Sequence, residues 1–193
     1  LVGSVDGVAR SKAELVDALP PDGIAVVPVS AELEPYLRDD IEILRVPPVD
    51  VELREDGAHV AFGDRRIRFP LTSRHQAQNA LAALTAYEAM GLPLDRLDEG
   101  AAAVRLSRWR GEELPLPGGG FVVNDAYNAN PTSMEAALRH LAERGEGRRR
   151  LAILGGMAEL GDHAERHHRA IAELAGELGV EVVAVGELAR AYG

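Results

Sequence analysis

The sequence contains no cysteine, one lysine among 21 basic side chains, and only 4% aromatic residues. The lack of cysteine excludes disulfides, thiolate metal sites and thiol catalysis. Because 46% of the residues are hydrophobic but few are aromatic, the core must be aliphatic. No apolar run approaches the roughly 20 residues that a membrane span requires, and no signal-peptide pattern opens the chain. These absences predict a cytoplasmic protein that does not associate with a membrane.

The charge balance is acidic, with a formal net charge of −10. It argues against nucleic acid or an anionic membrane surface as a partner, since either would need a basic field. The 193 residues could form one large or two small domains. The chain starts at Leu1 rather than methionine and stops soon after a predicted strand, so we expect a piece of a longer protein.

The first half of the chain predicts helices and short antiparallel hairpins. Alternating runs over residues 41–71, separated by Pro47-Pro48 and by Asp-Gly and Gly-Asp turns, are typical of hairpins. Ser73 and Gln76 are spaced as a capping box at the start of a helix. The other predicted elements here are a helix over 7–19, a buried strand over 24–29, a helix over 75–90 and a helix over 94–104.

The second half predicts alternating strands and helices. Residues 105–120 are rich in arginine, proline and glycine, and we place a domain boundary there, between residues 107 and 108. Alternation beyond it predicts an α/β domain with a mostly parallel sheet and right-handed crossovers. The predicted elements are a strand over 121–124, a helix over 132–144, a strand over 150–155, a helix over 163–178, a strand over 181–185 and a helix from about residue 187.

The most informative segment is NDAYNANPTSM at residues 124–134. It leaves the carboxyl end of a predicted strand, where open α/β sheets bind ligands. A helix cap would explain part of it, because Asn130 can be the N-cap with Pro131 at the first helical position, and Thr132 with Glu135 also fits a capping box. Capping leaves three polar side chains unexplained: Asp125, Tyr127 and Asn128.

This segment closely resembles the signature of the MurF group of Mur ligases, roughly DD-x-YNANP-x-SM, with Asn124 in place of the first aspartate. Three further segments agree in order and spacing: GSVDGVARSKAE at 3–14, RHQAQNALAA at 74–83 and LGGMAELG at 154–161. Enzymes of this group use ATP to join D-alanyl-D-alanine to UDP-N-acetylmuramoyl-tripeptide through an acyl phosphate. The resemblance implies that residues 1–107 are the second half of a central ATP-binding domain and that residues 108–193 begin a Rossmann-like C-terminal domain. It also implies a monomer.

The chain has no phosphate-binding loop of the form G-x-x-x-x-G-K-[ST], because Lys12 follows Arg10-Ser11 rather than glycine. The glycines at 118–120 and 155–161 do not fit G-x-G-x-x-G either. In the family, the phosphate loop and the glutamate and histidine that hold Mg2+ lie upstream of the segment matching Leu1. We therefore expect ATP and Mg2+ as cofactors of the complete enzyme and no activity from this chain alone.

Lys12 lies on a helical stripe with Val8, Leu15, Val16 and Leu19. The pattern alone favours a stem that packs on the core and an ammonium that reaches water. The alternative is a desolvated, nucleophilic amine. The resemblance implies the alternative, because in Mur ligases the lysine at this place reacts with carbon dioxide. The resulting carbamate helps to hold a second Mg2+, a hard cation that prefers oxygen ligands.

The resemblance assigns further roles. His75 and Asn79 would lie near the adenine, although their spacing alone favours a solvated first turn. Gln76 replaces the first asparagine of the family's HN-x-x-N pattern. Arg110, with Arg108 as the less favoured candidate, would reach the γ-phosphate through a bidentate contact. The remaining residues would lie around the loop, with Asp125 on the nucleotide side and with Tyr127, Asn128 and Asn130 facing the dipeptide.

Alternatives from other classes stay open. The chain could be a non-catalytic Rossmann-like binding module, another Mur-type ligase, or a metal hydrolase centred on His163 and His167. The two histidines lie one helical turn apart, but Glu165 between them stands at a position that fits neither H-E-x-x-H nor H-x-x-E-H. A capped, charged helix start explains the segment better. His168 aligns with a family histidine to which we assign no role. Gly156 stands where the family usually has aspartate.

Overall fold

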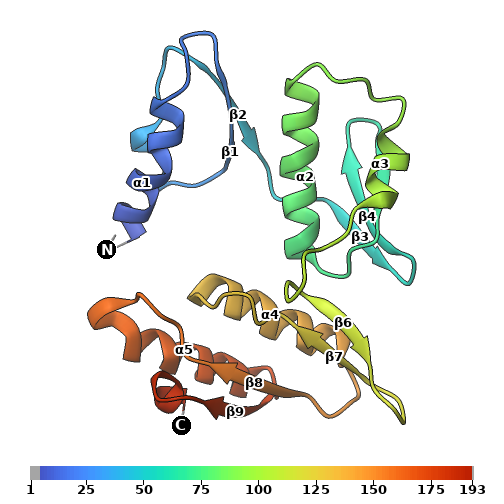
Figure 1. Cartoon of the computed structure of the whole chain (residues 1–193), viewed down its shortest axis with the longest axis vertical. Helices are drawn as coiled ribbons and strands as arrows, with labels where there is room; N and C mark the ends of the chain where they lie inside the picture. Colours follow the sequence, from blue (N-terminus) through green and yellow to red (C-terminus); the bar gives the residue numbers. More distant parts are fainter. Residues whose placement is uncertain (1–4, 193) are drawn as a thin grey trace. The chain divides into compact units, whose positions relative to one another are not determined.

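The computed structural model describes residues 5–192. Contacts between Cα atoms divide the chain into two compact units, Leu1–Arg105 and Leu106–Gly193 (Figure 1). This division falls two residues before the boundary placed from the sequence. The assignment of the two parts to particular ligase domains stays a prediction.

The N-terminal unit begins with a helix packed on two parallel strands. These elements are α1 (Val5–Asp17), β1 (Ile24–Pro28), the 3-10 turn η1 (Glu34–Tyr36) and β2 (Glu42–Val46). Ala13 and Val16 of α1 pack against Ala25 and Val27 of β1 in one small core. β2 pairs with β1 in parallel, Ile24 opposite Glu42. The prediction that hairpins begin at residue 41 was therefore wrong for β2.

Antiparallel strands follow, as predicted, from residue 51 onward. They are β3 (Val51–Arg54), β4 (Gly57–Phe62) and β5 (Arg65–Phe69), in that spatial order. Gly57 has a φ of 128°, and a Cβ atom there would lie 2.1 Å from the carbonyl oxygen of Phe69. Only glycine fits at this position, because the turn between β3 and β4 brings its backbone against the end of β5.

The larger core of this unit lies between these strands and two helices, α2 (Arg74–Ala89) and α3 (Leu97–Ala103). α2 stands beside β4 (Figure 1) and buries Ala77, Leu81 and Leu84. Its N-cap is Ser73, whose side chain accepts from the backbone N–H of Gln76. Only this half of the predicted capping box forms, because the Gln76 side chain accepts from Thr72 N at 3.0 Å instead of from Ser73 N.

The C-terminal unit contains two strand pairs and two main helices. Its elements are β6 (Glu112–Pro115), β7 (Phe121–Asn124), α4 (Pro131–Arg144), β8 (Leu151–Gly155), η2 (Gly161–His163), α5 (Ala164–Glu177), β9 (Glu181–Val185) and η3 (Leu188–Tyr192). β8 and β9 are parallel, as predicted. β6 was missed, and it pairs antiparallel with β7. Among the strands described here, these two pairs are separate two-stranded sheets rather than parts of one sheet.

α4 and α5 lie side by side (Figure 1) and share an aliphatic core with β8 and η3. Leu138 of α4 and Ile171 of α5 are almost fully buried in it, together with Met157 and Ala189. The predicted α/β fold class is thus confirmed. None of the helices in the described range is both long and apolar enough to cross a bilayer.

Candidate functional site

The residues singled out from the sequence divide between the two units. Lys12, His75 and Asn79 belong to the N-terminal unit. The C-terminal unit contains Arg110, Asp125, Tyr127, Asn128 and Asn130. The second set forms a local site, because the loop over residues 125–130 connects the carboxyl end of β7 directly to the start of α4.

The loop presents polar side chains to solvent. Asp125, Tyr127 and Asn128 are all exposed, and the Tyr127 residue is 58% accessible. Asn128 Oδ1 accepts from the backbone N–H of Ala129 at 2.8 Å, which stiffens the turn. Ala129 is partly buried against the core that contains Leu138 and Met157. The loop is therefore attached to the core through Ala129, while its polar side chains are exposed to solvent.

Asn130 and Ser133 form the capping box that starts α4. Asn130 Oδ1 accepts from Ser133 N at 2.9 Å, and Ser133 Oγ accepts from Asn130 N at 3.1 Å. Pro131 occupies the first helical position as predicted. The box pairs Asn130 with Ser133, so the predicted partnership of Thr132 and Glu135 was wrong. The Asn130 oxygen is thus engaged in the helix cap.

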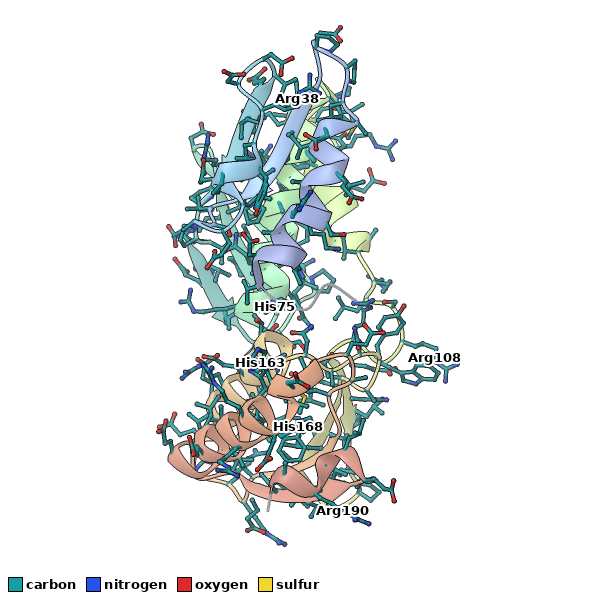
Figure 2. The ribbon with its side chains drawn as sticks, turned by 90° about the vertical axis from the view of Figure 1, so that its left-hand side faces the viewer. Arg38, His75, Arg108, His163, His168 and Arg190 are labelled. Atoms are coloured by element: carbon teal, nitrogen blue, oxygen red, sulfur yellow. The ribbon has the colours of Figure 1, made fainter. Side chains whose placement is uncertain are left out.

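Arg110 is drawn onto this loop by two contacts. The backbone N–H of Tyr127 donates to the carbonyl oxygen of Trp109 at 3.1 Å. The guanidinium carbon of Arg110 lies 3.8 Å from the centroid of the Tyr127 ring, within the range of a cation–π contact. Arg108, the less favoured candidate, lies over the Trp109 ring at 5.4 Å and extends away from the unit (Figure 2).

Backbone strain occurs at two separate places in the C-terminal unit. Two non-glycine residues of the described chain have positive φ, Trp109 at 65° and Glu159 at 62°. Trp109 immediately precedes Arg110, and Glu159 lies in the segment that follows β8. Such conformations cost about 1–3 kcal/mol and gather at functional sites.

The segment after β8 is held by a pair of rings that sequence reasoning missed. His168 is 1% exposed and lies inside the C-terminal unit (Figure 2). Its Nε2 accepts from the backbone N–H of Met157 at 2.9 Å, and its Nδ1 donates to the Ala164 carbonyl at 2.6 Å. The Tyr192 ring lies 4.9 Å from the His168 ring, and its hydroxyl donates to the Gly155 carbonyl at 3.0 Å. These contacts fix both ends of residues 155–157.

Gly156 lies between those two fixed residues. A Cβ atom at this position would lie 2.3 Å from Cβ of Leu188 in η3. No side chain fits there unless Leu188 moves. In this chain the space beside the backbone of residue 156 is filled by η3, which accounts for glycine at the position where aspartate was expected from the resemblance.

The β6–β7 hairpin is fastened to α4 through Glu113. Arg144 donates to Glu113 from Nε at 3.2 Å and from Nη2 at 3.0 Å, and it also covers the Phe121 ring. His140 is 8% exposed, with Nε2 3.5 Å from Glu113 Oε1, too far for a normal hydrogen bond. Burial lowers the pKa of His140, an effect only partly opposed by the Glu113 carboxylate. The hairpin that bears the loop is thus pinned by charged groups.

Comparisons with known proteins agree with this architecture. Residues 109–192 match the family described as "Mur ligase, glutamate ligase domain". The UDP-N-acetylmuramoyl-tripeptide–D-alanyl-D-alanine ligase of Bacillus subtilis strain 168 is 30% identical over 183 residues, which cover 87% of this chain and 39% of that protein. The chain belongs to the Mur ligase family.

Solved Mur ligases have the same fold. A crystal structure of MurF from Acinetobacter baumannii superposes with a TM-score of 0.85 and 28% identity, covering 99% of this chain and 45% of the other. MurF from Thermotoga maritima, solved in complex with ADP, gives a TM-score of 0.82 at 21% identity, which shows the fold, and covers 100% of this chain and 47% of the other. The chain therefore spans less than half the length of these relatives.

In this Mur ligase chain, Lys12 is exposed on α1 rather than desolvated. The buried side of the helix consists of Ala9, Ala13 and Val16. Lys12 lines an apolar cavity of about 580 Å³ together with Val8 and residues of β1. The apolar stripe predicted from the sequence is thus wider than the buried face of α1. Lys12 lies outside that buried face and is exposed to solvent.

The remaining candidates are the histidines. His75 and Asn79 are exposed on the first turns of α2, as their spacing allows. His163 precedes α5 as its N-cap residue but makes no side-chain capping bond. Within residues 5–192, no group of three or more His, Asp or Glu side chains could hold a metal ion. The structure therefore gives no support to a metal hydrolase centred on His163 and His167.

Proposed function

We propose that this chain is part of an ATP-dependent amide ligase that adds D-alanyl-D-alanine to UDP-N-acetylmuramoyl-tripeptide. The observation that supports this most directly is the exposed polar loop over residues 125–130, with the Arg110 guanidinium stacked on it, in a chain of the Mur ligase family. The substrates are those in the printed name of the Bacillus relative. One Mur ligase of the same fold was solved with ADP, which supports nucleotide use.

The proposed reaction has two steps. An oxygen of the terminal carboxylate of the tripeptide attacks the γ-phosphorus of ATP, and ADP leaves. The amine of D-alanyl-D-alanine then attacks the carbonyl carbon of the acyl phosphate, inorganic phosphate leaves, and the nitrogen gives up a proton as the amide forms. Fixing two reactants next to one another is itself a large part of such catalysis.

The exposed side chains of the C-terminal unit suit this chemistry. Arg110 would contact the γ-phosphate with its planar fork, because its guanidinium lies on the face of the Tyr127 ring, which uses none of its N–H donors. Asp125 would orient groups on the nucleotide side, and Asn128 with the Asn130 amide would contact the dipeptide. In the N-terminal unit, His75 and Asn79 would lie near the adenine.

Magnesium is proposed for the complete ligase only. The described residues provide no group of three or more acidic or histidine side chains that could hold a metal ion. Lys12, as a carbamate, would supply one oxygen ligand in the complete enzyme.

The test uses the full-length protein that contains this sequence. Release of ADP over many turnovers should require both UDP-N-acetylmuramoyl-tripeptide and D-alanyl-D-alanine, and mass spectrometry should show the joined product. Arg110→Ala and Asp125→Asn should each lower kcat by roughly a hundredfold, the usual size of lost electrostatic stabilisation. Arg139→Ala is the matched control, because Arg139 is an exposed arginine paired with Glu135 on α4. Binding of the substrates without ADP release would instead support a non-catalytic module and contradict the proposal.

A further inference from the structure

The segment that bears Arg110 continues the pairing of β6 and β7. In this antiparallel pair Glu112 lies opposite Asn124 and Glu113 opposite Val123. Following the same register beyond the end of the sheet places Trp109 opposite Tyr127. The hydrogen bond from Tyr127 N to Trp109 O, at 3.1 Å, shows that the register does continue. Arg110 is one residue away from the position opposite Tyr127, so the paired backbones bring the two residues close together, and the Arg110 guanidinium carbon lies 3.8 Å from the centroid of the Tyr127 ring.

Arg110 is held differently from four other arginines of its unit. Arg139, Arg144, Arg149 and Arg169 each pair with a glutamate at 2.6–3.0 Å. In the described chain Arg110 instead meets the face of Tyr127 at 3.8 Å and forms no ion pair. A carboxylate neutralises an arginine and uses its N–H groups, whereas the face of a ring uses none of the five donors. Stacking thus orients the guanidinium while leaving its charge and its donors available to an anion.

The backbone around Arg110 has the form of a tight, specified turn. The residues on either side of it are left-handed, Trp109 with a φ of 65° and Gly111 with a φ of 69°. A bulky residue in this conformation persists only where the surrounding structure fixes it. Here the hydrogen bond from Tyr127 to Trp109 supplies one such constraint.

We propose that Tyr127 is a positioning residue for Arg110, and that its ring, not its hydroxyl, is the functional group. The inference rests on the proposed function, in which Arg110 contacts the transferred phosphoryl group. It replaces the expectation, drawn from the family resemblance, that Tyr127 contacts the dipeptide. Tyr127 acts through Arg110 and so affects the phosphoryl step rather than binding of D-alanyl-D-alanine.

Two substitutions in the full-length enzyme separate the ring from the hydroxyl. Tyr127→Phe keeps the ring and should leave kcat at the wild-type value. Tyr127→Leu removes the ring and should lower kcat by about two- to fivefold, the size expected for one exposed cation–π contact, with an unchanged KM for D-alanyl-D-alanine. Phe121→Leu, which removes the ring that Arg144 covers in the same unit, is the matched control and should leave kcat unchanged.

A double-mutant cycle tests whether Tyr127 acts through Arg110. In an Arg110→Ala background, Tyr127→Leu should cause no further loss of the residual kcat. Three results would overturn the inference: an equal loss in Tyr127→Phe, a rise in the KM for the dipeptide in Tyr127→Phe, or a full additive loss in the double variant.

A measurement on residues 1–193 keeps this inference separate from the proposed function. Protons above the face of an aromatic ring resonate upfield, so the side-chain NMR signals of Arg110, identified by their loss in Arg110→Lys, should be shifted upfield. The shift should persist in Tyr127→Phe and vanish in Tyr127→Leu. An unshifted Arg110 in the wild-type chain refutes the pairing whatever the activity. A shifted Arg110 in a protein whose full-length form makes no product supports the pairing and refutes the proposed function.

Discussion

Replacing His168 by leucine should destabilise the C-terminal unit by about 2–4 kcal/mol. The substitution removes the acceptor of the buried Met157 N–H, which costs about 1–3 kcal/mol when it is left unpaired. It also removes the ring contact with Tyr192, worth about 0.5–1.5 kcal/mol. Leucine has nearly the same volume as histidine, so the expected loss of stability includes no contribution from a large cavity.

Urea unfolding of the whole chain measures the effect. Trp109 is the only tryptophan and lies in the C-terminal unit, so its fluorescence reports on that unit, while circular dichroism follows both. Two transitions would require separate fits, because a chain of two units need not unfold in one step. Amide exchange at Met157 gives a local readout and should accelerate in the variant.

Matched variants make the outcome specific. His163→Leu changes an exposed histidine just before α5 and should stay within about 0.5 kcal/mol of wild type. His168→Gln offers an oxygen that can accept from Met157 N and should recover part of the loss. The reasoning fails if His168→Leu is no more destabilising than His163→Leu, or if Met157 exchange is unchanged.

Three further predictions follow. Burial lowers the pKa of His140, so the neutral ring contributes fully to stability above about pH 6.5. Below that pH its contribution should decline by at most about 1.4 kcal/mol per pH unit. In urea melts, the free energy of unfolding should therefore fall less on acidification in His140→Leu than in the wild type. Equal losses would contradict the assignment to His140. Lys12 should give a carbamate signal in carbon-13 NMR of the full-length enzyme with labelled bicarbonate, and Lys12→Arg should lose activity; full activity in that variant excludes the role. Residues 1–193 alone should release no phosphate above a protein-free blank when both substrates and ATP are present.

The sequence predicted five C-terminal elements within one or two residues, because their local patterns are strong: β7, α4, β8, α5 and β9. The helix predicted from about residue 187 is instead the 3-10 helix η3. The helix α4 has a proline at its first position and an apolar residue every third or fourth place. β8 and β9 are short apolar runs bounded by glycine or charge, and the alternation of strands and helices correctly indicated that they are parallel.

The errors lie where structure depends on a partner rather than on local pattern. β2 has the composition of a hairpin strand, yet its partner is β1, 18 residues away by register from Ile24 to Glu42. β6 reads Glu-Glu-Leu-Pro, which is not a typical strand, and it exists because β7 supplies its hydrogen bonds. Thr132 with Glu135 also has the spacing of a capping box, and only the geometry shows that Asn130 is the N-cap and Ser133 its partner.

The candidate site was also predicted only in part, because some of its contacts join residues far apart in the sequence. The loop over residues 125–130 could be read from its polar residues between a strand and a helix. The role of His168 could not, because it depends on Met157 and Tyr192, which are 11 residues before it and 24 residues after it. One signal was present in the sequence: a histidine on the apolar stripe of α5, with Ile171 and Ala175 on the same buried face.

The missed strand β6 also explains the position of Arg110. A flexible linker would leave this guanidinium free to sample many positions. Instead, β6 holds Glu112 opposite Asn124, and the hydrogen bond from Tyr127 N to Trp109 O continues the pairing three residues further. Glu113 of the same strand is bound by Arg144 of α4, the helix that Asn130 caps. The hairpin, the loop and α4 are therefore all joined to one another by contacts. Because all of these contacts lie within the C-terminal unit, the pairing of Arg110 with Tyr127 should persist whatever the arrangement of the two units.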